Sequence, residues 1–244
     1  GNLPIVLSLM GSDAYGEYIG KDKIKFKSRL NILLTYCIQP FVKALVSKSK
    51  NIEKFVYLKK KSYVIPNGIN IEKIPDNKRD YQKDLNLNSK KKYILFLGSK
   101  TNVRKNYRLV KDSYNLIKNS NVELISPYPV KHEFVPKYLK SVNVLVLSSF
   151  AEGSPNIIKE AMACNCSIVS TRVGDVEWLL DGVEGCYTAD FDVADFANKI
   201  EKALEFSERI GRTKGRDRLI ELKLDTESVA KKLVEIYQDV VNNN

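Results

Sequence analysis

Residues 148–163 read SSFAEGSPNIIKEAMA and directly follow the apolar run NVLVL at residues 143–147. That run is rich in β-branched residues, which predicts a buried strand of a parallel sheet. Ser154 is a favoured helix cap, and Pro155 suits the first helical position, where its missing N–H costs no hydrogen bond. The stretch therefore predicts a strand, a short loop and a helix that begins at Pro155.

The start of this helix is predicted to bind a phosphate or diphosphate. A helix N-terminus preceded by a glycine, here Gly153, offers free backbone N–H groups and a positive dipole end. Glu152 lies in the loop before the helix, and Glu160 lies five residues past Pro155, about 7.5 Å along the axis. One carboxylate can reach each end of a ligand whose phosphates lie at the helix start. A nucleotide sugar has this form, with ribose hydroxyls, a diphosphate and hexose hydroxyls.

Strand and helix signals alternate from residue 93 onward. Helices between buried strands predict parallel pairing, and hence an α/β fold with a doubly wound, Rossmann-like sheet whose ligands bind at the carboxyl ends of the strands. The loop of Glu152 lies at that edge. The expected strands are 93–98, 122–125, 143–147, 167–170 and 185–187, and the expected helices are 106–119, 136–141, 155–163, 175–180, 196–206 (capped by Asp192) and one from 226 onward.

The first part of the chain predicts a second α/β unit. Its expected strands are 4–9, 44–47 and 63–65, with an amphipathic helix within 26–42 and a helix capped by Ser49 that runs toward residue 58. Residues 71–92 are polar and read as a linker. We therefore expect a first unit at 1–75, a linker at 76–92, a ligand-binding domain at 93–225 and a final helix at 226–244.

Charge is spread unevenly over the 244 residues, whose formal net charge is +11. Residues 21–92 hold 19 Lys and Arg against six Asp and Glu. Such a region attracts nucleic acid, anionic lipid or an anionic sugar acceptor alike. Nucleic-acid binding is not expected, because no aromatic-interleaved groove or known reading motif accompanies the charge. No apolar run approaches 18 residues, so no membrane span is predicted.

The four cysteines, Cys37, Cys164, Cys166 and Cys186, lack a paired metal-ligand spacing and read as reduced thiols of a cytoplasmic protein. Asp190 and Asp192 have a spacing that can hold a divalent cation, but they precede a helix, where aspartates serve as caps. We therefore expect no metal site.

Several motifs together resemble the retaining glycosyltransferases of the GT-B fold, most closely family 4. Glu152 and Glu160 in EGSPNIIKEAMAC look like the paired-glutamate signature of that family. The resemblance extends to VIPNGIN at 64–70, RKN at 104–106 and SIVSTRVGDVEWL at 167–179. It implies a GT-B-like fold and transfer of a hexose from a nucleotide-diphosphate sugar to a glycan or lipid-linked acceptor, with retention and without metal. It also suggests polysaccharide or glycolipid assembly in the cytoplasm, with peripheral contact at the anionic inner membrane face.

The resemblance assigns roles to individual residues. Glu160 would bind the ribose hydroxyls and Glu152 the sugar ring, while Arg104 and Lys105 would neutralise the departing diphosphate. The remaining expected contacts with the donor are Gly153, Ser154, Pro155, Asn156 and Ile157 at the helix start, Gly98 and Ser99 after a strand, Gly174 and His132 in neighbouring loops, and Gly11 and Asp13 in the first unit.

Two departures from the family keep an alternative open. Met10 stands where relatives commonly carry a histidine before the glycine of the Gly11 loop, so the donor differs, another group substitutes, or catalysis is weak. A complete enzyme would also be expected to carry a further stretch before Gly1, so the chain looks like a fragment. The alternative is a nucleotide-sugar or polyanion-binding module without turnover. The sequence leaves the base, the sugar, the acceptor and the oligomeric state open.

Overall fold

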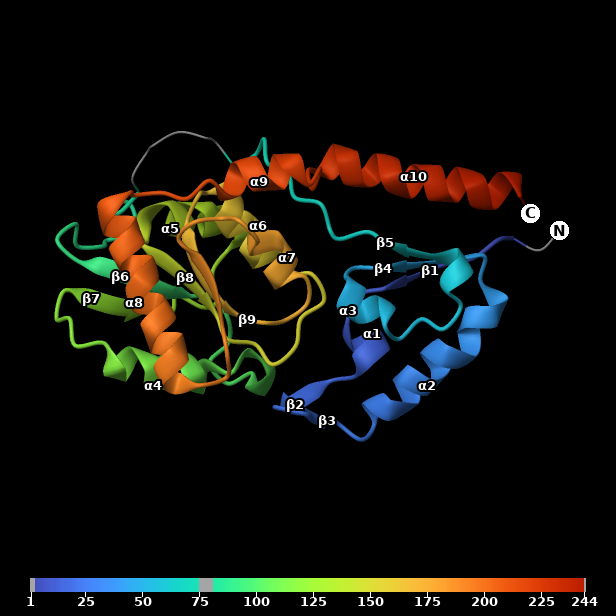
Figure 1. Cartoon of the computed structure of the whole chain (residues 1–244), viewed down its shortest axis with the longest axis horizontal. Helices are drawn as coiled ribbons and strands as arrows, with labels where there is room; N and C mark the ends of the chain where they lie inside the picture. The colour runs from blue at the N-terminus through green and yellow to red at the C-terminus, as the bar shows by residue number, and fades with distance from the viewer. Residues whose placement is uncertain (1–2, 75–80, 244) are drawn as a thin grey trace.

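The computed structural model describes residues 3–74 and 81–243, which form two α/β units side by side along the long axis of the molecule (Figure 1). Each unit is built on a parallel sheet. The N-terminal sheet has the order β1-β4-β5 and comprises β1 Val6–Leu9, β4 Ala44–Ser47 and β5 Ser62–Val64. The C-terminal sheet has the order β10-β9-β8-β6-β7 and comprises β6 Lys92–Phe96, β7 Val122–Ile125, β8 Val144–Leu147, β9 Ser167–Thr171 and β10 Cys186–Ala189.

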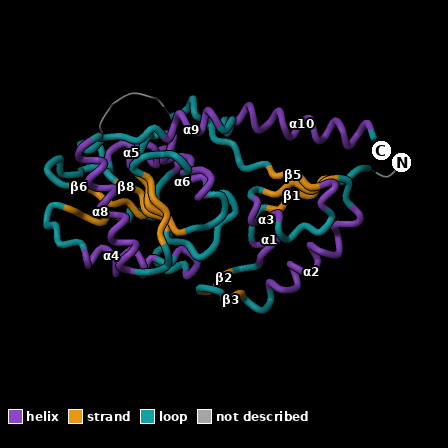
Figure 2. Tube along the Cα trace, viewed as in Figure 1, coloured by secondary structure: helices purple, strands orange, loops and turns teal. Residues whose placement is uncertain are grey.

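Helices cover both faces of the C-terminal sheet, which confirms the predicted doubly wound α/β fold (Figure 2). Successive strand residues point to opposite faces, so Ile94 and Phe96 pack in one layer while Tyr93 and Leu95 pack in the other. The first layer contains α4 Tyr107–Leu116 and α8 Val193–Arg209. The second contains α5 Val135–Ser141, α6 Asn156–Ala163, α7 Val176–Leu180 and α9 Gly215–Glu221.

The order of the C-terminal strands shows at which point along the carboxyl edge of the sheet a ligand is expected to bind. β6 lies in the sheet between β7 and β8, so the chain leaves β6 toward one side and later returns to the other side at β8. Such a switch in strand order opens a crevice at the carboxyl ends of the two strands. Lys105 lies in the segment after β6 and Glu152 in the loop after β8, so both flank this crevice.

The N-terminal unit adds short elements that the sequence patterns did not reveal. These are α1 Ser12–Tyr15, a hairpin of β2 Tyr18–Gly20 and β3 Lys23–Ile24, and the short 3-10 helices η1 Gln39–Phe41 and η2 Lys59–Lys61. The expected helices within 26–42 and after Ser49 are present as α2 Ser28–Ile38 and α3 Lys50–Glu53. α1 and α3 pack on the sheet through a small core around Leu9 and Leu45. The hairpin lies against η3 Val103–Lys105 of the C-terminal unit, so the two units meet near the ligand edge.

The last helix, α10 Thr226–Asn242, extends over the N-terminal sheet (Figure 1). The amide of Thr226 donates to the carbonyl of Ile69 at 3.0 Å. Val229 and Ile236 are buried in the same core as Val46 of the N-terminal sheet. The final helix therefore ties the end of the chain to the first unit.

Expectations about two helices need correction. Ser154 does not cap the motif helix: Pro155 is the cap residue, the helix begins at Asn156, and no side chain caps it. Ser49 caps α3 as expected, but that helix ends at Glu53 rather than near residue 58. The helix α9 was not expected. The limits of the expected domains remain predictions, and residues 75–80, which span the end of the expected first unit and the start of the expected linker, lie outside the described residues.

Candidate functional site

A cavity of about 270 Å³ lies over the start of α6 at the crevice of the C-terminal sheet. Its polar lining comes from Lys105, Glu152 and Asn156. Its apolar lining is Leu97, Val130, Val135, Pro155 and Ile157, together with the ring of Tyr128. The backbone amides at the start of α6, the ammonium of Lys105 and the carboxylate of Glu152 thus lie around one cavity that also has an apolar wall.

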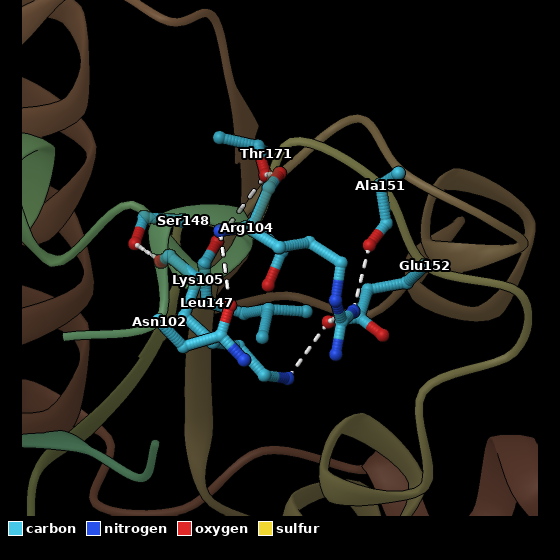
Figure 3. Close-up of polar contacts among 9 residues, drawn as sticks. Asn102, Arg104, Lys105, Leu147, Ser148, Ala151, Glu152 and Thr171 are labelled. Carbon is cyan, nitrogen blue, oxygen red and sulfur yellow. Dashed lines mark hydrogen bonds and ion pairs between the residues drawn. The ribbon is translucent and has the colours of Figure 1, made fainter. Parts of the chain in front are cut away.

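Glu152 forms an ion triad with the two basic residues expected beside it (Figure 3). Its Oε1 lies 2.8 Å from Lys105 Nζ and 2.8 Å from Arg104 Nη1. Arg104 Nη1 also donates to the carbonyl of Ala151 at 2.9 Å. Burial alone would raise the pKa of Glu152, but the charges of Lys105 and Arg104 outweigh it and hold the pKa below its usual value. Glu152 is therefore an anion held between two cations.

The backbone explains why the triad forms. The Phe150 amide donates to the Arg104 carbonyl at 2.8 Å, and the Ser148 hydroxyl donates to the Lys105 carbonyl at 2.8 Å. These bonds join the segment after β6 to the loop after β8 across the crevice. Asn102 caps η3 by accepting from the Arg104 amide at 3.0 Å, which fixes where the two basic side chains begin.

Glu160 lies about one turn into α6 and is only 9% exposed. His132 Nε2 lies 2.8 Å from Glu160 Oε1, and the imidazole itself is 85% exposed. Glu160 does not line the cavity, but the segment of Tyr128 and Val130 that precedes His132 does. The exposed imidazole thus covers the carboxylate at the edge of the cavity. The sequence placed both residues near the ligand edge but did not predict that they pair.

Ser154 has a different place from the one expected. Its hydroxyl donates to Asp175 Oδ2 at 2.6 Å and accepts from Lys159 Nζ, so it is occupied inside the protein. Ser154 is buried and absent from the cavity lining. Its side chain anchors the loop, and a contact of its amide with a ligand stays a prediction.

Two glycines let backbone segments meet behind the cavity. A Cβ on Gly153 would lie 2.3 Å from the Met10 carbonyl oxygen, and one on Gly174 would lie 2.4 Å from the Gly153 oxygen. Gly174 also has a φ of +58°, which side chains rarely adopt. The loop expected to line the sugar pocket therefore packs on the motif loop, which in turn packs on the Gly11 loop.

The Gly11 loop comes from the N-terminal unit and is held by its own carboxylate. Asp13 accepts hydrogen bonds from the amides of Met10 at 2.9 Å and Gly11 at 2.6 Å. The Tyr15 hydroxyl lies beside Gly11. Burial raises the pKa of Tyr15 to about 12, and the nearby Glu152 charge adds to the shift. Tyr15 is a residue near the site that sequence reasoning missed, because α1 carried no recognisable pattern.

The remaining expected contacts lie at the rim of the site or away from it. Gly98 packs beside the Lys105 side chain, and Ser99 bonds Thr101, but neither lines the cavity. Lys100 Nζ lies 5.1 Å from the centroid of the Tyr107 ring. Asp192 caps α8, accepting from the Asp195 amide at 2.8 Å, and Asp190 pairs with Arg172. The cap interpretation is thus confirmed for Asp192, and the ion pair of Asp190 with Arg172 was not predicted.

The fold is that of GT-B glycosyltransferases. A sucrose-phosphate synthase from Thermosynechococcus elongatus superposes with a TM-score of 0.81 at 17% identity, covering 100% of this chain and 69% of that one. Anabaena HepE, solved in complex with UDP-glucose, gives a TM-score of 0.72 at 13% identity and covers 97% and 72% of the two chains.

Sequence comparison points to the same class. Residues 87–205, just under half of the chain, match the family model for glycosyl transferases group 1. An uncharacterized glycosyltransferase of Methanocaldococcus jannaschii is 26% identical over 232 residues, which cover 88% of this chain and 62% of that protein. The chain thus spans under two thirds of this relative. The partial match to this family model agrees with the GT-B fold of the chain.

Proposed function

We propose that this protein transfers a hexose, with retention, from a nucleotide-diphosphate sugar to a glycan or lipid-linked acceptor. The observation that carries the proposal is the cavity in which the start of α6 faces Lys105 and Glu152. A helix start and fixed cations suit a diphosphate. The superposable HepE was solved with UDP-glucose, a ligand of this chemistry.

The proposed binding mode assigns each of the four parts of the donor to its own group of residues. The diphosphate lies on the amides of Asn156 and Ile157 and beside Lys105, with Arg104 nearby. The ribose hydroxyls bind Glu160 once His132 moves aside, because this carboxylate is otherwise engaged with the imidazole. The base lies on the apolar wall that includes Tyr128. Glu152 accepts from sugar hydroxyls when the diphosphate draws the cations away from it.

The chemical step needs no protein base in this proposal. The acceptor oxygen bonds to the anomeric carbon as the bond from that carbon to the phosphate oxygen breaks. The acceptor proton passes to the departing phosphate oxygen. Lys105 and Arg104 stabilise the charge that builds on the diphosphate, which is why no metal is included in the proposal. Transfer is accordingly expected to persist in excess EDTA.

The first test of the proposal is nucleotide release. The chain is incubated with a panel of nucleotide sugars, and the freed nucleoside diphosphate is measured with and without simple glycan acceptors. We expect release from at least one donor and loss of release in Glu152→Gln. Absence of release from every donor, despite donor binding, would instead favour a binding module without turnover. Met10, at the position where the family that the sequence resembles commonly carries a histidine, motivates this second candidate.

We also propose a cytoplasmic location with peripheral contact at an anionic membrane. α2 exposes Leu30, Leu33 and Leu34 by 57–60%, and lysines at 21, 23, 25 and 27 precede it. Apolar side chains beside lysines suit an anionic bilayer surface. Among the described residues, no helix is long and apolar enough to cross a bilayer. Cosedimentation with phosphatidylglycerol vesicles but not with phosphatidylcholine vesicles is the expected result.

A further inference from the structure

Lys159 is a fully buried lysine in the middle of the motif helix. Its Nζ donates to the carbonyl of Asn67 at 2.9 Å and to the Ser154 hydroxyl. Ser154 in turn donates to Asp175 Oδ2 at 2.6 Å. Asn67 lies in the turn after β5, Ser154 and Lys159 lie in the motif loop and the helix α6 that follows it, and Asp175 lies at the start of α7. One polar chain of hydrogen bonds therefore joins three segments that are apart in sequence.

This polar chain of hydrogen bonds connects the two units of the molecule. Asn67 belongs to the N-terminal unit, 92 residues before Lys159, whereas Ser154 and Asp175 belong to the C-terminal unit. A second contact lies close by: Asn51 Nδ2 of α3 donates to the Gly174 carbonyl at 2.6 Å. The Gly153 backbone meets the Met10 carbonyl in the same region. The polar chain therefore includes Ser154 of the loop that carries Glu152 and lies next to the contact of that loop with the N-terminal unit.

A buried ammonium is costly unless it is paired, so its presence calls for a specific role. Lys159 is surrounded on α6 by Ile158, Ala161 and Met162, all fully buried, and an apolar residue would have suited the same place. Burial lowers the pKa of Lys159 to about 8, while Asp175 opposes that shift. Burial also raises the pKa of Asp175. The negative charge of Asp175, which Lys159 reaches through the Ser154 hydroxyl, thus offsets part of the desolvation cost.

We propose that Lys159 is a positioning residue that fastens the Asn67 turn to the motif loop and so holds the Gly11 loop against Gly153 when the donor is bound. The inference rests on the proposed glycosyl transfer, because its benefit lies in aligning the sugar held by Glu152 with groups of the N-terminal unit. Lys159 contacts neither the cavity nor, in the proposed binding mode, the donor.

The test uses two variants and one control. Lys159→Met keeps the length of the side chain but leaves Asp175 buried without its cation, so it can also weaken folding. Lys159→Met with Asp175→Asn removes both charges and separates the two effects. Lys231→Met changes an exposed lysine on α10 and serves as the control.

Three measurements are made on each protein. Calorimetry with UDP and kinetics with the donor found by nucleotide release separate binding from turnover. Hydrogen exchange of the peptide covering residues 66–71, measured by mass spectrometry, reports on the Asn67 turn without any substrate. For the double variant we expect UDP affinity within about twofold of wild type, a kcat at least tenfold lower, and faster exchange at 66–71.

The outcomes distinguish this inference from the proposed function. Unchanged kcat and unchanged exchange in the double variant would overturn the positioning role. So would a loss of UDP affinity as large as the loss of kcat, because that result indicates a general disruption of the site. If the wild type turns over no donor, the proposed transfer fails, while the exchange measurement still decides whether Lys159 fastens the turn.

Discussion

At the scale of single residues, the site rests on two carboxylates that are each already paired. Glu152 is held by Lys105 and Arg104, and Glu160 is held by His132. A ligand that uses these carboxylates must replace or rearrange their partners. Mutating the two acids is therefore expected to have different effects on the stability of the fold, because only the partners of Glu152, Lys105 and Arg104, are permanent cations.

Glu160→Ala is predicted to lower nucleotide affinity beyond detection by calorimetry, because it removes the acceptor proposed for the ribose hydroxyls. His132→Asn is the matched variant: it removes the imidazole that covers Glu160 and is expected to change affinity by less than about tenfold. An unchanged affinity for UDP in Glu160→Ala would remove the ribose role from Glu160.

Glu152→Gln is predicted to destabilise the fold at pH 7 by about 1–3 kcal/mol, because two partly buried cations lose their shared anion. The folded-state pKa of Glu152 lies below its usual value of 4.5. Its contribution to stability is therefore complete well above pH 4.5 and is lost as the pH falls through the folded-state pKa. Urea unfolding at pH 7 and at lower pH should show the difference between wild type and Glu152→Gln shrinking on acidification. A difference that grows on acidification would contradict this account of the triad.

At the scale of elements, the start of α6 depends on close backbone packing around Gly153. Gly153→Ala is predicted to push the motif loop away from Met10, because the added Cβ meets a backbone oxygen that cannot easily move. We expect a loss of donor turnover of at least tenfold. Gly20→Ala is the control, since a Cβ there makes only ordinary contacts with Lys23. Turnover by Gly153→Ala equal to that of the control would show that the contact is dispensable.

The sequence predicted most elements of the C-terminal unit because their patterns are local. β7 was predicted with the bounds it has, and the strand before the motif loop was predicted within one residue. The helix start was displaced by one residue, because a distant aspartate, Asp175, engages the Ser154 hydroxyl. α1 and the β2–β3 hairpin were missed, since they are too short to develop a periodicity.

The candidate site was predictable only in part. The placement of Glu152 beside Lys105 and Arg104 follows from the carboxyl edge of parallel strands. The contacts of His132 with Glu160 and of Lys159 with Asn67 join segments 28 and 92 residues apart. No spacing rule in the sequence encodes such contacts, because they depend on how loops and units pack.

At the scale of the whole molecule, α10 follows the C-terminal unit in the chain and packs on the N-terminal unit. Ile236→Ala is predicted to cost about 2–4 kcal/mol of unfolding free energy, because it leaves a cavity where the helix packs on the N-terminal sheet. Val241→Ala, 65% exposed on the same helix, should change stability by less than about 0.5 kcal/mol. Denaturant unfolding of both variants checks this, and equal stabilities would mean that α10 contributes little to the fold.

The central claim is that the start of α6 receives a diphosphate between Glu152 and Glu160. A crystal of the protein soaked with UDP-glucose tests it most directly. We predict phosphate oxygens within hydrogen-bond distance of the Asn156 or Ile157 amide and of Lys105 Nζ, with the ribose at Glu160. A nucleotide bound elsewhere in the crystal, with the start of α6 empty, would contradict the account.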